Sequence, residues 1–466
     1  MLGVIALWLV FRLWYLAPRF SDAHHVVYAG YLLTQGLTLY QDIFYTSPPL
    51  LPYLYAGMGR VFGFGWLLFN VFGILLTAVD ALVLYALAAK WWSRKVGLLA
   101  ATMFLFSFVV LATTDFLSDI HVTLTLILLG MLAYSREQHA LSGVLFGLAA
   151  LSKIYTVVAY GPLVLAYLVA RRWRRLLSNV VAMAAVFGVT VGWLAVRHGG
   201  TFLALVFGDH FGKFGTLEGL SKSAIGSYFI KHDPWLILGA VVVLLMMALI
   251  LKTVRFKEGL KLPEIHHLLL PLFLSAGFLS FFFIFPDGYY FYLKILAAWL
   301  ALIVAAGIYY LVADDSPRWL ASLPSVLIIL AIINSGYLYL TQQAQAAVVT
   351  DYAAIRQFVD QQTAPDEPLY GTFELVPLLD LDRPIFNNRF NTIAKYFDLG
   401  VFDYRERMIE IRDGHLRTII TKAYTEEGVL VTADIEGLLP EAVYGQLCHQ
   451  RCAISEELGR LDRTTV

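Results

Sequence analysis

The chain has 466 residues, of which 59% are hydrophobic and only 15% are charged. A soluble protein carries about a quarter charged residues, so this composition excludes an ordinary soluble protein. The formal net charge is zero, and nothing in that balance indicates a nucleic-acid partner.

Apolar runs recur along the chain, several of them near the roughly 20 residues that cross a bilayer. Clusters of Lys and Arg, which mark cytoplasmic helix ends, lie at 90–95, 136, 171–175, 252–261 and 318. Placing these clusters inside predicts eleven transmembrane helices in a multi-pass cell-membrane protein, most simply a prokaryotic one. They are an N-terminal helix, two short helices in 140–170 that turn near Lys153, and spans at 62–90, 97–113, 120–135, 176–196, 234–252, 267–285, 292–312 and 319–340.

The N-terminal helix shows no basic leader and no small-residue cleavage site, so we expect it to remain as an anchor. Arg12 within it has two interpretations: a side chain that reaches the outer interface, or a cation that faces a cavity. The following segment, 18–60, is too polar to span but rich in aromatic residues. It predicts interfacial helices on the outer leaflet, broken before the next span by Pro48, Pro49 and Pro52.

Composition changes after about residue 340. Residues 1–340 are expected to form the transmembrane module, and 341–466 a small extracytoplasmic α/β domain with strands at P-L-Y-G-T, T-I-I-T-K-A and G-V-L-V-T-A. Cys448 and Cys452 both lie in this domain, and the sequence leaves open whether they form a disulfide.

Acidic side chains gather at the predicted outer helix ends. Asp22 lies in S-D-A-H-H, Asp42 in the same outer segment, and Asp115 and Asp119 in the next loop. Each could simply cap a helix or turn. The catalytic interpretation takes Asp22 as a general base on an acceptor hydroxyl, with Asp115 and Asp119 orienting it, positioning the acceptor or holding a metal.

Cations and aromatic residues on the same side could bind a substrate. Lys153, Lys213 and Lys222 are candidates for an anionic leaving group, with Lys231 and Lys294 also placed outside; the alternatives are snorkelling and ordinary solvation. His24, Tyr45, Tyr289 and Tyr290 could bind a sugar or line a lipid groove, although an aromatic belt explains the last two equally well. His210 and His232 could hold a divalent metal only if distant loops converge.

The first 340 residues resemble the GT-C superfamily of integral membrane glycosyltransferases, which use polyprenyl-phosphate-linked sugars. The resemblance lies in the early Asp22 and in the ordered motifs Y-L-L-T-Q-G-L-T-L-Y-Q-D, P-P-L-L-P-Y-L-Y-A, T-T-D-F-L-S-D-I and G-L-A-A-L-S-K. It is strongest to the branch with protein O-mannosyltransferases and the lipid A aminoarabinose transferase. It implies a GT-C fold, Asp22 as catalytic base, and inverting transfer of a hexosyl or pentosyl group to a glycan, lipid or protein.

The chain departs from that branch at two points. Asp22 is followed by Ala23 rather than Glu, and Thr46-Ser47 precede Pro48 where relatives have Glu-Lys. The phosphate-binding lysine is therefore expected elsewhere, at Lys153. The W-W-D-x-G motif is missing, which argues against en bloc transfer to Asn. Two rival functions stay open: a transporter or flippase of lipid-linked sugars, and a non-catalytic glycan-binding membrane protein.

Overall fold

The computed structural model describes residues 1–16, 24–114, 119–208, 222–237, 239–241, 290–311 and 331–341, with residues 271, 274, 275, 277, 329, 360 and 364 and four short strands. Several sequence-predicted elements lie at least half outside these residues: the spans at 234–252, 267–285 and 319–340, most of 341–466, Cys448 and Cys452.

The N-terminal helix is α1 (Leu2–Trp14), and its arginine points into the protein. Arg12 is fully buried, with its guanidinium carbon 4.3 Å from the centre of the Tyr339 ring. The interfacial interpretation of Arg12 is therefore wrong. One helical turn earlier, Trp8 is also buried, and its Nε1 donates a hydrogen bond to the carbonyl oxygen of Leu105 at 2.8 Å.

The predicted interfacial segment contains α2 (His24–Thr34) and α3 (Leu50–Phe62), which pack against each other. The prolines begin α3 rather than only breaking the segment: Pro49 is its N-cap, and Pro52 lies in the first turn, where no amide donor is needed. The crossing point is Gly30, where an added Cβ would lie 3.0 Å from Ala56 N and from Pro52 O. Glycine is therefore required for this close approach.

Among the described residues, three helices contain a stretch long and apolar enough to cross a membrane. They are α4 (Trp66–Trp91), α10 (Trp173–Leu203, continued by the π-helical turn η1, Ala204–Gly208) and α15 (Leu293–Leu311, preceded by the 3₁₀ turn η3, Tyr290–Tyr292).

A fourth candidate span is bent. The single helix predicted at 97–113 is instead α5 (Arg94–Leu105) and α6 (Phe108–Thr114), which meet at 58°. The break is stabilised by a side chain from far along the chain. Asp233 accepts hydrogen bonds from Phe108 N (2.7 Å), Val109 N (2.8 Å) and Ser107 Oγ (2.9 Å). These contacts satisfy amide groups that a helix start leaves unpaired.

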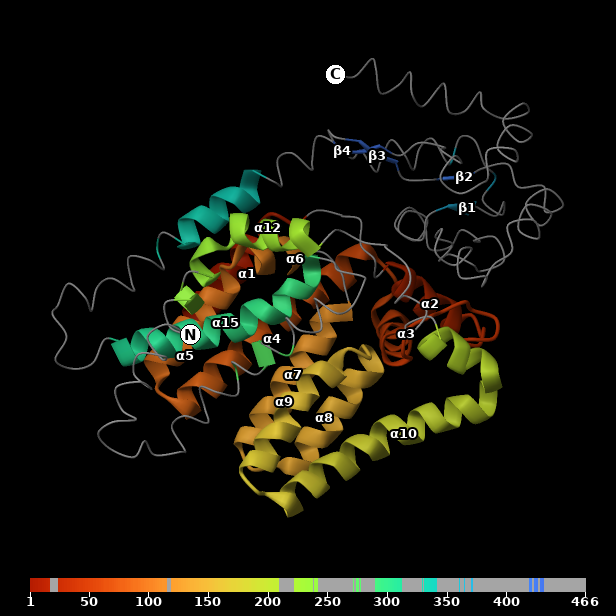
Figure 1. Cartoon of the computed structure of the whole chain (residues 1–466). Coiled ribbons are helices and arrows are strands. Elements are labelled where there is room, and N and C mark those ends of the chain that lie inside the picture. Colours follow the sequence, from red (N-terminus) through yellow and green to blue (C-terminus); the bar gives the residue numbers. More distant parts are fainter. Residues whose placement is uncertain are drawn as a thin grey trace.

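Three further helices lie side by side, with α10 running past them (Figure 1). They are α7 (Asp119–Ser135), α8 (His139–Ser152) and α9 (Thr156–Val169). The two short helices predicted in 140–170 are thereby confirmed, and they turn at Lys153, whose backbone is extended (φ −149°, ψ 122°). At Gly143 an added Cβ would lie 2.1 Å from Asn179 O, so α8 and α10 touch backbone to backbone.

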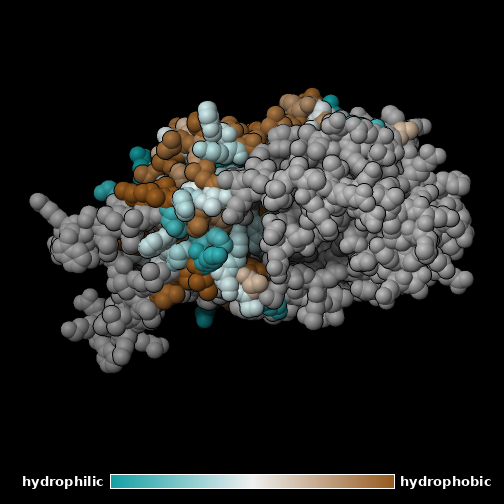
Figure 2. Space-filling model, turned by 90° about the horizontal axis from the view of Figure 1, so that it is seen from above, coloured by the Kyte–Doolittle hydropathy of each residue, from teal (hydrophilic) through white to brown (hydrophobic). Residues whose placement is uncertain are grey.

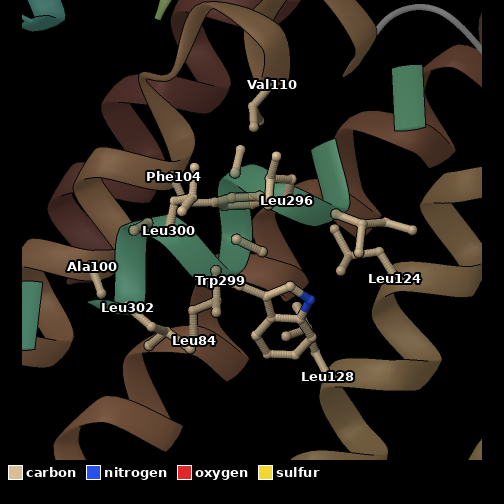
Figure 3. Packing of buried hydrophobic residues seen from close by; sticks show 14 of the residues in the cluster. Leu84, Ala100, Phe104, Val110, Leu124, Leu128, Leu296, Trp299, Leu300 and Leu302 are labelled. Carbon is tan, nitrogen blue, oxygen red and sulfur yellow. The ribbon is translucent and has the colours of Figure 1, made fainter. Parts of the chain in front are cut away.

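Two hydrophobic clusters hold these helices together. The larger joins α1, α4 to α9 and α15; in Figure 3, Trp299 projects from α15 toward Leu128 of α7. The smaller joins α2, α3 and their connecting loop to Phe69 of α4 and Phe202 of α10. Apolar side chains cover much of the described surface seen in Figure 2. Val189 and Val196 of α10 are among the exposed apolar residues, as expected for a helix that faces lipid.

Two elements complete the described chain. Helix α12 (Lys222–His232) packs against α6. In the C-terminal region, β1 (Tyr370–Gly371) pairs in parallel with β2 (Ile419–Ile420), and β3 (Ala423–Thr425) pairs antiparallel with β4 (Gly428–Leu430). Strands β1, β2 and β4 fall in the three segments predicted from sequence, whereas β3 begins at the last residue of the second segment and extends beyond it.

Candidate functional site

Lys153 and Asp119 form an ion pair at the end of the bundle where α7 begins. Lys153 Nζ donates to Asp119 Oδ2, and the side chains are only 12% and 16% exposed. Hydrogen bonds next to the pair connect α7 to the end of α8. Thr123 Oγ1 donates to the Asp119 carbonyl at 2.8 Å, so the 2.9 Å contact between Thr123 and Ser152 has the Ser152 hydroxyl as donor. The turn between α8 and α9 is thereby tied to the first turn of α7.

Two tyrosine rings flank the lysine. Lys153 Nζ lies 5.5 Å from the ring centre of Tyr155 and 5.7 Å from that of Tyr292, and the two rings meet edge to face at 5.9 Å. An ammonium group at this distance is attracted by the ring quadrupole. The lysine therefore lies in an aromatic frame built by the α8–α9 turn and η3.

A groove opens beside this frame between α7, α9 and α15. Its walls are mainly apolar: Ile120, Thr123, Ile127, Lys153, Tyr155, Thr156, Val158, Ala159, Leu274, Tyr292, Ile295 and Trp299. Two buried polar atoms in this lining, Thr156 Oγ1 and Trp299 Nε1, make no hydrogen bond to any residue that the structure describes. The groove thus combines apolar walls with one ion-paired lysine at its edge.

Two buried tyrosines from the first predicted outer segment face the same acid. Burial raises the pKa of Tyr45 well above its usual range, and the negative charge of Asp119 raises it further. The same two causes raise the pKa of Tyr55. The Tyr55 hydroxyl is buried and has no hydrogen-bond partner in the described part of the chain. Sequence reasoning missed Tyr55, although it stands in the quoted P-Y-L-Y-A motif.

The remaining sequence-predicted residues are only partly described. Asp22, Asp115, Lys213, Tyr289 and His210 lie outside the described residues. His24 begins α2, but its side chain is not among those described. Asp42 stabilises a turn, which was the alternative to a catalytic role, because its Oδ2 accepts a hydrogen bond from Thr38 N at 2.8 Å.

Lys222, His232 and Tyr290 lie on α12 and η3. Lys222 begins α12, and His232 ends it. His232 stacks on Phe108 at 4.5 Å and donates from Nδ1 to Tyr228 O at 2.8 Å, while Tyr290 packs on Tyr228 at 5.6 Å. No group of three or more His, Cys, Asp or Glu side chains suited to a metal occurs among the described residues. A divalent metal stays a prediction.

Lys294, which the sequence offered as a cation on the outer side, does not lie at the protein surface. It is fully buried in the first turn of α15, bonded to Thr77 and His121. Asp233, which follows His232, is the carboxylate that caps α6. Burial raises its pKa to about 6, and the hydrogen bonds from α6 oppose that rise.

Comparisons with known proteins agree with this architecture. Residues 46–196 match the family described as dolichyl-phosphate-mannose-protein mannosyltransferase. ArnT from Cupriavidus metallidurans bound to undecaprenyl phosphate is similar over 94% of this chain and 99% of its own, with 14% identity and a TM-score of 0.61. The archaeal oligosaccharyltransferase AglB from Archaeoglobus fulgidus, in complex with an inhibitory peptide and a dolichol-phosphate, is similar over 90% of this chain and 69% of its own, with 12% identity and a TM-score of 0.56.

None of the curated proteins compared with the chain matches it. The apolar helices and the two solved structures together indicate a multi-pass membrane protein. The resemblance read from the sequence is confirmed, and the chain has the fold of the GT-C superfamily of membrane glycosyltransferases.

Proposed function

We propose that the chain is a glycosyltransferase that moves a sugar from a polyprenyl-phosphate-linked donor to an acceptor hydroxyl on the extracytoplasmic side. The observation that carries this proposal is the position of Lys153, an ammonium group beside an apolar groove. A polyprenyl phosphate has the matching chemistry, with one anionic group on a long hydrocarbon chain. The phosphate ligands named for ArnT and AglB support this choice.

In this proposal each part of the groove has a role. The first isoprenoid units lie along α7, α9 and α15, and the phosphate oxygens accept hydrogen bonds from Lys153. Asp119 holds the ammonium group in the aromatic frame before the donor arrives. Charge-assisted hydrogen bonds to phosphate are about twice as strong as neutral ones, so Lys153 supplies much of the headgroup affinity.

The reaction is a single displacement at the anomeric carbon. The acceptor oxygen bonds to that carbon, the bond from the carbon to the phosphate oxygen breaks, and Asp22 takes the acceptor proton. Polyprenyl phosphate leaves as a stable anion, so the reaction requires no strong general acid; Lys153 stabilises the charge that develops on the phosphate. The assignment of Asp22 rests on its sequence context and on the family resemblance. Asp115 is its proposed partner, and Tyr45 and Tyr55 face the transferred sugar.

The proposal is tested first by binding, which does not require knowledge of the sugar. Undecaprenyl phosphate is titrated into the purified protein and detected by native mass spectrometry. We expect Lys153→Met to weaken binding by about ten- to a hundredfold, since a hydrogen bond to a charged group contributes about 1.5–3 kcal/mol. Lys231→Met, which removes an exposed lysine at the end of α12, is the matched control and should bind as the wild type does.

The second test is transfer of radiolabel from polyprenyl-phosphate sugars, including mannose, to membrane acceptors. Asp22→Asn should abolish transfer and leave undecaprenyl phosphate binding intact. Equal binding by the wild type and Lys153→Met would refute the assignment of Lys153 to the phosphate site. Full transfer by Asp22→Asn would refute the assignment of Asp22 as the base.

A further inference from the structure

Five polar side chains are buried together where α4, α7 and α15 meet. They form what we call the interior polar cluster: Thr77, Asp80, His121, Thr125 and Lys294. All are at most 6% exposed, and Asp80 and Lys294 are fully buried. Ionisable side chains inside a membrane bundle are costly and commonly serve a function.

Lys294 is the centre of the cluster. Its Nζ donates to Thr77 Oγ1 at 2.7 Å, contacts His121 Nδ1 at 2.5 Å and lies 3.9 Å from Asp80 Oδ2. Thr125 Oγ1 donates to Asp80 Oδ1 at 2.5 Å. An ammonium group has donors only, so His121 accepts through Nδ1 and carries its ring hydrogen on Nε2. One lysine from α15 is therefore bonded to both α4 and α7.

The cluster lies next to the site along the chain. His121 follows Asp119 by two residues on α7, and Lys294 follows Tyr292 by two residues at the start of α15. Helix α15 packs chiefly against α5 and makes few backbone contacts with α4 or α7. Beside the apolar packing of Trp299, Lys294 thus supplies a polar tie between the helix that follows Tyr292 and the helix that carries Asp119.

The neighbouring backbone is shaped for the same contact. At Gly73 of α4, an added Cβ would lie 3.1 Å from Thr114 O and 3.4 Å from His121 Cδ2. The tight contact is with the last residue of α6, and the His121 ring lies at ordinary van der Waals distance from the added Cβ. Gly73 therefore lets α4 pass close to the end of α6, directly beside the cluster.

We propose that the interior polar cluster is a positioning device, which fixes α15 against α7 and so holds Tyr292 beside the Lys153–Asp119 pair. Lys294 and His121 act through Tyr292 and Asp119 and touch no substrate. This inference rests on the proposed function, because it takes Tyr292 and Lys153 to line the donor groove. It also corrects the prediction that Lys294 meets solvent or phosphate.

The test removes the tie without leaving a buried charge. Lys294→Met alone would strand the Asp80 carboxylate, so Lys294→Met is combined with Asp80→Asn, whose amide oxygen can still accept from Thr125. We expect this double variant to fold and to retain a cooperative melting transition. We also expect at least a tenfold weaker binding of undecaprenyl phosphate and a tenfold lower turnover. Thr190→Val, which removes a helix hydroxyl of α10, is the control and should change neither.

A cross-linking measurement separates this inference from the proposed function. Cys448 and Cys452 are first replaced by Ser, and Lys153→Cys and Tyr292→Cys are introduced for a short bismaleimide. We expect cross-linking to be at least tenfold slower in the Asp80→Asn/Lys294→Met background. An unchanged rate overturns the positioning role, whatever the wild type binds. Absence of lipid binding by the wild type, with slowed cross-linking, overturns the proposed function and leaves the positioning role in place.

Discussion

Asp119 and Lys153, 34 residues apart, meet because α7 begins at the acid and the α8–α9 turn presents the lysine. Neither side chain is exposed by more than 16%, so the pair is largely removed from water. In such a position each charge depends on the other, since the loss of one partner leaves an uncompensated ion.

The first prediction is a coupling energy between these two residues. Lys153→Met and Asp119→Asn should each lower the free energy of unfolding by about 1–3 kcal/mol, while the double variant should cost less than the sum, with a coupling of about 1–3 kcal/mol. Denaturant unfolding in detergent micelles measures all four proteins. Additive single effects would show that the two side chains do not stabilise each other.

The second prediction concerns the Tyr55 hydroxyl. Because it is buried without a partner among the described residues, Tyr55→Phe should leave stability unchanged or raise it by about 1 kcal/mol. If the hydroxyl faces the sugar, transfer should fall about tenfold. The control is Tyr167→Phe, which removes a hydroxyl bonded to His139 Nδ1 at 2.7 Å; it should lower stability by about 1 kcal/mol and leave transfer unchanged. Equal transfer by Tyr55→Phe and wild type would contradict the sugar contact.

The third prediction is a pH dependence of stability from Asp233. Its folded pKa of about 6 lies above the ordinary value of 3.8, so the folded state binds more protons between these pH values. The stabilising contribution is fully present below about pH 4 and is lost as pH rises through 6. This difference of about two pKa units corresponds to on the order of 3 kcal/mol in the free energy of unfolding. Melting curves of wild type and Asp233→Asn from pH 4.5 to 7.5 test this: the variant should lack the decline, and parallel curves would refute it.

The fourth prediction concerns the contact of α8 with α10. Gly143→Ala places a methyl group 2.1 Å from Asn179 O and must displace backbone, so we expect a loss of several kcal/mol or failure to accumulate in membranes. Gly188→Ala in α10 is the control, since nothing lies within 4 Å of its added Cβ; helix propensity should make it neutral or stabilising by about 1 kcal/mol. Similar yields of both variants would contradict the close packing.

Sequence reasoning located the helices best where apolar length and basic flanks act together. The helix at 62–90 and the short pair within 140–170 follow directly from those two signals. The bend between α5 and α6 could not be predicted in this way, because residues 97–113 are continuously apolar and the cause is Asp233, more than 120 residues away. Hydropathy records what a segment buries, not which distant carboxylate interrupts it.

The candidate site could likewise be predicted from the sequence only in part. Lys153 was singled out because a lysine between two short apolar helices needs a polar surrounding, and the structure supplies one in Asp119. Lys294 was instead grouped with the outer cations. Its partners, Thr77 and His121, are polar residues within apolar segments and gave no signal of their own. Their convergence depends on how three helices pack, which no single segment encodes.

The capping of α6 by Asp233 also constrains the order in which the contacts of this helix form during biosynthesis. Ser107, Phe108 and Val109 emerge from the ribosome well before the acid that accepts their hydrogen bonds. Until residue 233 has been synthesised, these three donors lack the Asp233 carboxylate as their acceptor. The bend can therefore be capped only after residue 233 has been made, and a nascent chain that ends before this residue should lack the three hydrogen bonds.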